Sequence, residues 1–219
     1  MLGLSGGLDS AVAAALTAHA LGRESVLAIY MPCHSLDADR RDASAVAAHL
    51  GIEYREVDLG PVFDDLVGAC RLDGASRLTL ANMKPRLRMT VLYAFSSGRL
   101  VVGTGNYSEY LVGYSTKWGD AAADIMPLAR LYKDEVAALG RELGLPRGII
   151  ERVPSAGLWE GQSDEGEMGV TYASIRACFE GQPVDPESSA RIAAMKGSSE
   201  HKRAPIPYFD ARGWLSANA

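Results

Sequence analysis

The chain has 219 residues, 47% of them hydrophobic and 22% charged, which suits one globular domain with a sizeable core and not a disordered or repetitive chain. Its formal net charge of −5 at pH 7 gives no general attraction to nucleic acid or to an anionic membrane surface, so we expect neither as a partner. No apolar run approaches the roughly 20 residues of a membrane span and no signal-peptide pattern opens the chain, so the expected location is cytoplasmic. The three cysteines form no CxxC pair, as expected of free thiols in a reducing compartment.

Short β-like runs alternate with amphipathic helices in the first half of the chain, which predicts βαβ units around a parallel sheet. In chain order, the predicted elements are a strand at 1–4, a helix at 9–21, a strand at 25–31, a helix at 42–50, a strand at 54–58, a helix at 85–95 and a strand at 100–102. The near-continuous apolar run at 25–31 is typical of a strand in the middle of such a sheet. We therefore expect an α/β fold with an open parallel sheet flanked by helices.

The second half of the chain is predicted to be mainly helical. Apolar spacing indicates a helix at about 131–143, and Asp185 followed by proline is a good start for another short helix. A tail of about 197–219 completes what we expect to be a single domain spanning residues 1–219.

A segment rich in glycine, serine and acidic residues, 155–169, interrupts the regular pattern. It is too long for a passive connection, and Trp159 is its only large anchoring residue. We therefore expect a mobile lid.

The most informative motif is Ser5-Gly6-Gly7-Leu8-Asp9-Ser10, which we call the glycine turn; it lies where the first strand is expected to meet the first helix. Glycines there let backbone N–H groups point toward one place, and the helix N-terminus adds partial positive charge, so phosphate is the expected ligand. The motif is not a Walker A loop, because no Gly-Lys-Ser/Thr follows, and it is not GxGxxG. The alternative is a purely structural tight turn in which Asp9 caps the helix.

The glycine turn resembles the signature of the N-type ATP pyrophosphatases. In that superfamily the turn holds the departing pyrophosphate of ATP, and the aspartate, here Asp9, holds magnesium. The resemblance implies ATP and Mg²⁺ as cofactors. It also implies a Rossmann-like fold of the adenine nucleotide alpha hydrolase type.

Further segments narrow the resemblance to the ammonia-dependent NAD⁺ synthetases. They are residues 84–89, 103–109, 116–124, 154–162 and 201–203. These segments and the glycine turn occur in the family's order and cover nearly the whole chain, which makes their joint occurrence far more specific than any one of them. The implied activity is ATP-dependent amidation of deamido-NAD⁺ with ammonia, giving NAD⁺, AMP and pyrophosphate through an NAD-adenylate.

The resemblance also implies site roles at the matching positions. The implied ATP-binding residues are Gly3, Leu4, Ser5, Gly6, Gly7, Leu8, Asp9, Ser10, Met31, Thr104, Lys133 and Ser155. The implied deamido-NAD⁺-binding residues are Arg86, Lys117, Asp124, His201 and Lys202. Basic groups suit the pyrophosphate and carboxylates of that ligand. Taken singly, each charged residue would also be explained as a surface charge, and Met31 as a core residue.

Two of these positions stand out from the residues alone. Glu109 follows the end of a predicted parallel strand, the edge where ligands bind in open α/β sheets, so it could pair with Asp9 around Mg²⁺. By resemblance, Asp9 and Glu109 are the metal ligands. Lys133 lies in the first turn of a predicted helix, where a cation opposes the helix dipole. This mismatch indicates a lysine retained for an anionic ligand.

Asp9, Lys133 and Asp120 are the expected catalytic residues. Lys133 would neutralise the departing pyrophosphate together with the magnesium that Asp9 holds, and Asp120 would bind ammonium and take its proton. Because the chain has no room for a glutaminase domain and no cysteine in a nucleophile motif, free ammonia is the expected nitrogen donor.

Other functions stay open from the sequence. One is another adenylating enzyme of the same superfamily that transfers an amide or a sulfur, such as a tRNA thiolation enzyme, although paired cysteines and a basic RNA-binding appendage are missing. Another is a non-catalytic nucleotide sensor, which the retained carboxylates and lysine argue against. The acid that is amidated could also be a relative of deamido-NAD⁺. The resemblance implies a homodimer.

Overall fold

A three-stranded parallel sheet lies at the centre of the fold, as the computed structural model shows for residues 1–155 and 161–217. The strands β1 (Leu2–Gly3), β2 (Leu27–Tyr30) and β3 (Glu53–Glu56) lie in that order. Val102 continues the sheet through single parallel bridges to Leu2 and Ile125, so the strand predicted at 100–102 is reduced to one bridging residue. The predicted open parallel sheet flanked by helices is confirmed.

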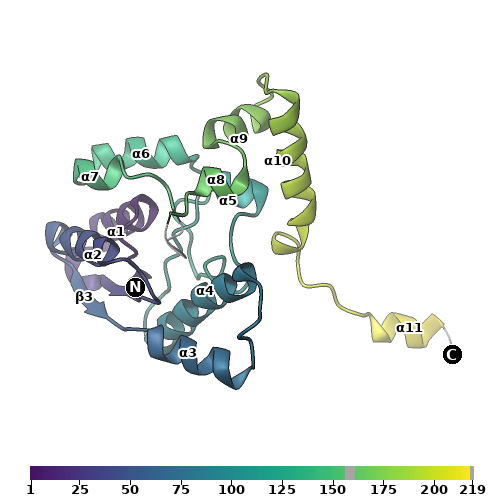
Figure 1. The fold of residues 1–219 in the computed structure, drawn as a ribbon, viewed down its shortest axis with the longest axis horizontal. Coiled ribbons are helices and arrows are strands. Elements are labelled where there is room, and N and C mark those ends of the chain that lie inside the picture. Colours follow the sequence, from purple (N-terminus) through teal and green to yellow (C-terminus); the bar gives the residue numbers. More distant parts are fainter. Residues whose placement is uncertain (156–160, 218–219) are drawn as a thin grey trace.

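Helices cover the sheet on both sides, as Figure 1 shows. The α-helices of the described residues are α1 (Leu8–Leu21), α2 (Asp37–Leu50), α3 (Gly60–Ala69), α4 (Arg77–Ala94), α5 (Tyr107–Val112), α6 (Lys133–Glu142), α7 (Arg147–Ile150), α8 (Asp164–Met168), α9 (Tyr172–Phe179), α10 (Pro186–Ser198) and α11 (Ala211–Ala217). Two 3-10 helices, η1 (Arg23–Ser25) and η2 (Glu200–Lys202), complete the set.

Some predicted boundaries were wrong. The helix predicted from 85 begins at Arg77, because Ser76 caps it by accepting a hydrogen bond from the Thr79 N–H. Pro85 therefore lies inside α4, where it can donate no backbone hydrogen bond. The helix predicted from 42 begins at Asp37, and the strand predicted from 25 begins at Leu27. Helices α3 and α9 were missed altogether.

The expected lid at 155–169 is only partly described. Residues 156–160 lie outside the described residues. The end of the segment is a short helix, α8, capped by Ser163, with Asp164 and Met168 buried. The last part of the expected lid is therefore helical, and the mobility of the segment stays a prediction. The expected tail likewise contains the end of α10, η2 and α11.

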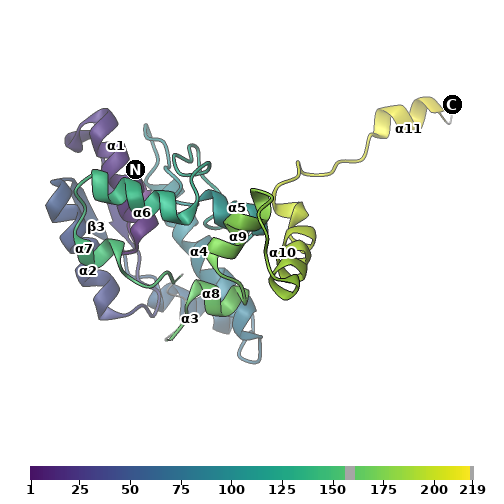
Figure 2. The same ribbon diagram turned by 90° about the horizontal axis from the view of Figure 1, so that it is seen from above.

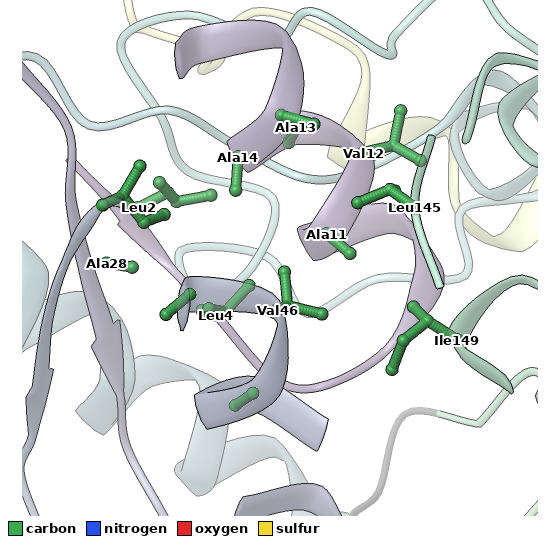
Figure 3. Packing of buried hydrophobic residues seen from close by; sticks show 14 of the residues in the cluster. Leu2, Leu4, Ala11, Val12, Ala13, Ala14, Ala28, Val46, Leu145 and Ile149 are labelled. Atoms are coloured by element: carbon green, nitrogen blue, oxygen red, sulfur yellow. The ribbon is translucent and has the colours of Figure 1, made fainter. Parts of the chain in front are cut away.

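Side chains of β1 and β2 alternate between two cores, as the period of a strand requires. Leu2, Leu4 and Ala28 pack with α1, α2, α6 and α7 on one face, and Figure 3 shows Ala11 and Ala14 of α1 beside Leu2 and Leu4. Small alanines let this helix approach the sheet closely, which brings the start of α1 to the strand ends. Met1, Leu27 and Ile29 face the other way, toward α3 and α4.

A third cluster lies outside the sheet and joins α5, α8, α9 and α10. Beyond it, the segment after residue 203 leaves the body and ends in α11, which lies apart from the other helices in both Figure 1 and Figure 2. Exposed large apolar side chains follow this C-terminal arm: Ile206, Tyr208, Phe209, Trp214 and Leu215. Within the described residues, no helix is long and apolar enough to cross a membrane.

Candidate active site

One pocket of about 420 Å³ opens where the strands of the sheet end. Residues that follow β1, β2 and Val102 form its floor, namely Ser5, Met31 and Thr104. One face of α4 forms a wall, and Lys133 of α6 closes another side. A pocket at the carboxyl ends of parallel strands is the usual ligand site of open α/β sheets.

The glycine turn supplies backbone donors at one end of the pocket. Helix α1 begins just after Gly7, and no side chain of the described residues caps it. The first-turn amides of a helix lack partners within the helix, so they are available to an anion. Ser5 Oγ and Ser10 Oγ lie 3.0 Å apart, and Ser10 Oγ donates to the Gly7 carbonyl at 2.9 Å. These bonds hold the turn in shape without a ligand.

Gly6 is required by the fold of this turn. Its φ of +83° lies in the left-handed region, and a Cβ there would lie 2.5 Å from the Asp39 carbonyl oxygen. Gly7 has an ordinary φ of −89°, and its Cβ would meet only Ser5 Oγ at 3.4 Å. The two glycines therefore have different roles, because only Gly6 is needed for close packing against α2.

Two carboxylates converge on one ammonium group beside the turn. Lys133 Nζ donates to Asp9 Oδ2 and lies 3.5 Å from Glu109 Oε1, and the lysine is only 8% exposed. Asn106 Nδ2 donates to the other Asp9 oxygen at 3.0 Å. Asn106 and Glu109 also form a reciprocal capping box at the start of α5. The cap thus connects the local fold of α5 to the position of both carboxylates.

Burial and charge shift the pKa values in this cluster. Burial raises the pKa of Glu109 to about 8, with Lys133 opposing and Asp9 reinforcing the change. Burial alone would lower the pKa of Lys133, but the charges of Asp9 and Glu109 outweigh it and raise that pKa. A pair of carboxylates that holds one cation so closely has a donor set suited to a hard cation such as Mg²⁺.

A second acidic group lies beside the first, and sequence reasoning missed it. Asp164 of α8 is buried, and burial raises its pKa. The Tyr172 hydroxyl donates to Asp164 Oδ2 at 2.9 Å, and the Tyr114 hydroxyl donates to Glu167 Oε2 at 2.7 Å. Two acids after a glycine-rich stretch read as a solvated segment. Only the folding of α8 against α5 and α9 places them in the pocket.

Asp120 lines the pocket on the side of α4. The Thr116 N–H donates to Asp120 Oδ1 at 2.7 Å, and burial raises the pKa of the carboxyl. Lys202 Nζ donates to the carbonyls of Gly113 and Ser115, and its positive charge partly opposes the shift. Asp120 is therefore a fixed carboxylate with raised proton affinity, which suits proton transfer.

Two arginines of the pocket were also missed. Arg88 of α4 lines it, with Nε donating to the Met31 carbonyl at 3.1 Å. Arg152 ion-pairs with Asp39 and Asp42 and donates to the Gly6 carbonyl at 3.3 Å, so it joins the segment before Ser155 to the glycine turn. Helical spacing on α4 could have found Arg88, because it falls on the same face as Pro85. No local pattern marks Arg152.

The structure brings most of the predicted residues into this pocket. Those that line it are Gly3, Leu4, Ser5, Gly7, Leu8, Asp9, Ser10, Met31, Thr104, Glu109, Asp120, Lys133, Ser155 and Lys202. Those that do not line it are Gly6, Arg86, Lys117, Asp124 and His201.

The residues outside the pocket have partners within the chain. Arg86 Nε donates to the Lys117 carbonyl at 3.3 Å, and Lys117 Nζ donates to the His201 carbonyl at 2.7 Å. Asp124 accepts from the Val101 N–H at 2.7 Å and from the Tyr93 hydroxyl at 3.1 Å. We call Arg86, Lys117, His201 and Lys202 the basic rim. Asp124 is not part of the basic rim, because its carboxylate is bonded to Val101 and Tyr93.

Comparison with known proteins agrees with this site. The model of the NAD synthase family matches residues 1–206. The NH(3)-dependent NAD(+) synthetase of Methanococcoides burtonii is 44% identical over 99% of this chain and 90% of its own. NMN synthetase from Francisella tularensis superimposes with a TM-score of 0.91 at 38% identity, covering 95% of this chain and 88% of that one.

A third relative is another solved structure with the same fold. NH3-dependent NAD synthetase from Campylobacter jejuni superimposes with a TM-score of 0.80 at 29% identity, over 95% of this chain and 88% of that one. The resemblance found in the sequence motifs is thereby confirmed over nearly the whole chain. The chain belongs to the NAD synthase family.

Proposed function

We propose that this chain uses ATP to join ammonia to deamido-NAD⁺, giving NAD⁺, AMP and pyrophosphate through an NAD-adenylate. The observation that carries the proposal is one pocket that combines the glycine turn, the Asp9–Glu109 carboxylate pair and Lys133. Backbone donors and cations beside carboxylates suit a triphosphate that must lose pyrophosphate. Membership of the NAD synthase family supports the same reaction.

The chain's own groups have distinct tasks in this reaction. The substrate carboxylate attacks the α-phosphorus, and the first-turn amides of α1 stabilise the charge that develops on pyrophosphate. Lys133 can also stabilise that negative charge, because its ammonium is bonded to Asp9 of the glycine turn. Ammonia then attacks the acyl carbon, and AMP leaves.

The donor set fits a resident Mg²⁺. Asp9 and Glu109 would hold the ion, which supplies charge neutralisation at the phosphates. Mg²⁺ is commonly held by one or two carboxylates together with substrate phosphates, which fits this pair of acids beside the glycine turn. The ammonium of Lys133 lies against both carboxylates in this structure, which supports the proposal that this pair binds a cation.

Asp120 is our candidate for binding ammonium and accepting its proton. It lies in the pocket, and its raised pKa favours proton uptake. In the Asp120→Asn variant we expect the apparent KM for ammonium to rise about 10- to 100-fold, the range of a lost charge-assisted hydrogen bond. The KM for ATP should stay within about threefold of wild type. Unchanged ammonia kinetics would remove Asp120 from this role.

The segment around Ser155 is proposed to close over the adenylate and exclude water. Arg152 supports this, since its bonds to Asp39, Asp42 and the Gly6 carbonyl anchor one end of the segment to the glycine turn. The packing of α8 through Asp164 and Met168 anchors the other end. Closure between two anchored ends would protect the activated acid from hydrolysis.

The basic rim is proposed to bind the part of the dinucleotide that extends out of the pocket. Hydrogen bonds from Arg86 to the Lys117 carbonyl and from Lys117 to the His201 carbonyl connect its members, and Lys202 lines the pocket itself. Asp124 remains a proposed contact only through the resemblance, because both of its oxygens have partners in this chain. We also propose a homodimer, supported by the exposed apolar side chains of the C-terminal arm.

A second candidate substrate is the mononucleotide acid whose amide is NMN. The observation that favours it is the likeness to NMN synthetase from Francisella tularensis, which exceeds the likeness to the Campylobacter NAD synthetase in both identity and TM-score. Both acids carry the same nicotinate carboxylate, so the chemistry in the pocket would be unchanged. The difference lies in whether the basic rim has an adenylyl group to hold.

One assay tests the proposal and separates its rivals. Purified protein with ATP, Mg²⁺ and ammonium is given deamido-NAD⁺, nicotinate mononucleotide, tRNA or no acceptor, and pyrophosphate and amide are measured. We expect release only with a nicotinate acid, and a kcat/KM for deamido-NAD⁺ about tenfold or more above the mononucleotide, equivalent to about 1.4 kcal/mol. The reverse ratio of kcat/KM values would favour the second candidate. If neither nicotinate acid gave pyrophosphate and amide, both candidates would be overturned.

A further inference from the structure

Arg88 is a pocket residue without an assigned role. It lies on the face of α4 that lines the pocket, together with Ala81, Pro85 and Met89. These residues recur at helical spacing, so the helix itself directs the guanidinium toward the pocket. The arginine is partly exposed, and the pocket is what it faces.

The bonds of Arg88 leave most of its donors available. Nε donates to the Met31 carbonyl at 3.1 Å, and Nη2 lies 3.5 Å from Ser35 Oγ, at the limit of a hydrogen bond. No carboxylate of the described residues lies within ion-pair distance of Arg88, and Asp120 and Asp39 act on it only at longer range. A guanidinium has five N–H donors, so three remain for a ligand. Three donors on a guanidinium that faces the pocket suit an anionic ligand that the described residues do not supply.

The position of Arg88 distinguishes it from Lys133. Lys133 lies beside the glycine turn with Asp9 and Glu109, at the end proposed for the departing pyrophosphate. Arg88 is bonded to the carbonyl of Met31, which follows β2, where the apolar lining residues Met31, Met89 and Leu92 suit the adenosine of ATP. A phosphate between adenosine and the turn is the α-phosphate. We propose that Arg88 binds the phosphate of the adenylyl group in ATP, in the NAD-adenylate and in AMP; this rests on the proposed function.

The chemistry gives this contact a purpose in both steps. In the first step the substrate carboxylate oxygen forms a bond to the α-phosphorus, and the bond to the β-phosphate oxygen breaks with its electron pair leaving on pyrophosphate. In the second step the ammonia nitrogen forms a bond to the acyl carbon, the acyl carbon–oxygen bond breaks, and AMP leaves with that electron pair. The nitrogen, which attacks as NH3, then gives one proton to a base and becomes the amide NH2. Pyrophosphate leaves after the first step, so only a group fixed on the adenylyl phosphate can stabilise charge in both.

Affinities for three small probes test the proposal. AMP, adenosine and pyrophosphate are titrated into wild type, Arg88→Met, Arg88→Lys and the control Arg147→Met, which changes an exposed arginine of α7. We expect Arg88→Met to weaken the binding of AMP about 10- to 100-fold, the range of hydrogen bonds to a charged group. The affinities for adenosine and pyrophosphate should stay within about threefold of wild type. Arg88→Lys should recover part of the AMP affinity, and the control should match wild type.

Other outcomes would overturn the proposal. Equal losses for AMP and adenosine would mean that Arg88 only positions the segment of Met31 and Ser35. Unchanged AMP affinity, or a loss confined to pyrophosphate, would also contradict it. If Arg88→Met shows no thermal unfolding transition, the Arg88→Lys variant decides, because lysine cannot reproduce two separate guanidinium contacts. In that variant the affinity for AMP should fall about tenfold and the affinity for adenosine should not change.

The probes also separate this inference from the proposed function. AMP binding needs no nicotinate acid and no ammonia. If the wild-type protein binds AMP through Arg88 but forms no NAD⁺, the Arg88 proposal holds and the proposed reaction is refuted. A wild type that forms NAD⁺ while Arg88→Met binds AMP normally would do the reverse.

Discussion

The two ends of the pocket are organised in different ways. At the phosphate end, the glycine turn is one contiguous stretch whose serine hydroxyls and α1 amides are already in place. At the basic rim, Arg86, Lys117 and His201 come from separate segments and bond to backbone carbonyls of one another. The first end is preformed, and the second must exchange internal hydrogen bonds for a ligand. We therefore expect larger mutational effects at the phosphate end.

The largest effect should come from Lys133→Met. Removing the ammonium leaves Asp9 and Glu109 facing each other and takes away a cation proposed to stabilise pyrophosphate. We expect kcat/KM to fall about 10²- to 10³-fold, the usual cost of one electrostatic contact in a transition state. Steady-state kinetics measure this, with Lys196→Met on α10 as the surface control. A loss below about threefold would mean that the phosphate end does not depend on this cation.

The glycines of the turn form a matched pair. In Gly6→Ala the new methyl group would meet the Asp39 carbonyl oxygen at 2.5 Å and the backbone would stay at positive φ. We expect the free energy of unfolding to fall by about 2–4 kcal/mol from strain and overpacking. Gly7→Ala should cost no more than about 1 kcal/mol, as at other helix caps. Chemical denaturation compares the two, and equal costs would contradict a turn held by Gly6 against α2.

Arg86→Met tests the basic rim. Its guanidinium is exposed and bonds to one carbonyl, so we expect little change in stability. The KM for deamido-NAD⁺ should rise about tenfold, as for loss of one charge-assisted hydrogen bond, while the KM for ATP stays unchanged. Steady-state kinetics in both substrates decide. A rise in the KM for ATP of the same size would show that the two ends are not separate.

The smallest effects are expected at two helix caps, where the comparison separates an effect on stability from an effect on activity. Asn106→Ala removes the cap of α5 and the hydrogen bond to Asp9, whereas Ser76→Ala removes only the cap of α4. Each should lower the free energy of unfolding by about 1 kcal/mol. Only Asn106→Ala should also reduce kcat, because only that cap positions a site carboxylate. Equal activities would show that Asp9 needs no such support.

The same contrast explains what could be predicted from the sequence. The glycine turn was predictable because chain order alone places it between β1 and α1. Asp164 was not predictable, because it depends on α8 folding from a segment that has the composition of a loop. Arg88 lies within the predicted helix 85–95 and was missed, although its helical spacing could have found it. The start of α4 was missed because proline usually marks a helix boundary, and here the helix tolerates it in its interior.

In the basic rim, a match to a family motif does not by itself place a side chain in the pocket. Lys117 and Lys202 each match a family motif, in segments 116–124 and 201–203, but only Lys202 lines the pocket. Asp124 matches as well, yet its carboxylate is bonded to the Val101 N–H and the Tyr93 hydroxyl. Spacing along the chain shows which residues match a family motif, whereas only tertiary contacts show whether a side chain is available to a ligand.

The account rests on the glycine turn as the phosphate site, and a crystal structure with Mg²⁺ and a non-hydrolysable ATP analogue tests it most directly. We predict the β- and γ-phosphates against the first-turn amides of α1, the adenosine beside Met31 and the α-phosphate in contact with Arg88. A triphosphate bound elsewhere, with the turn left empty, would contradict the account.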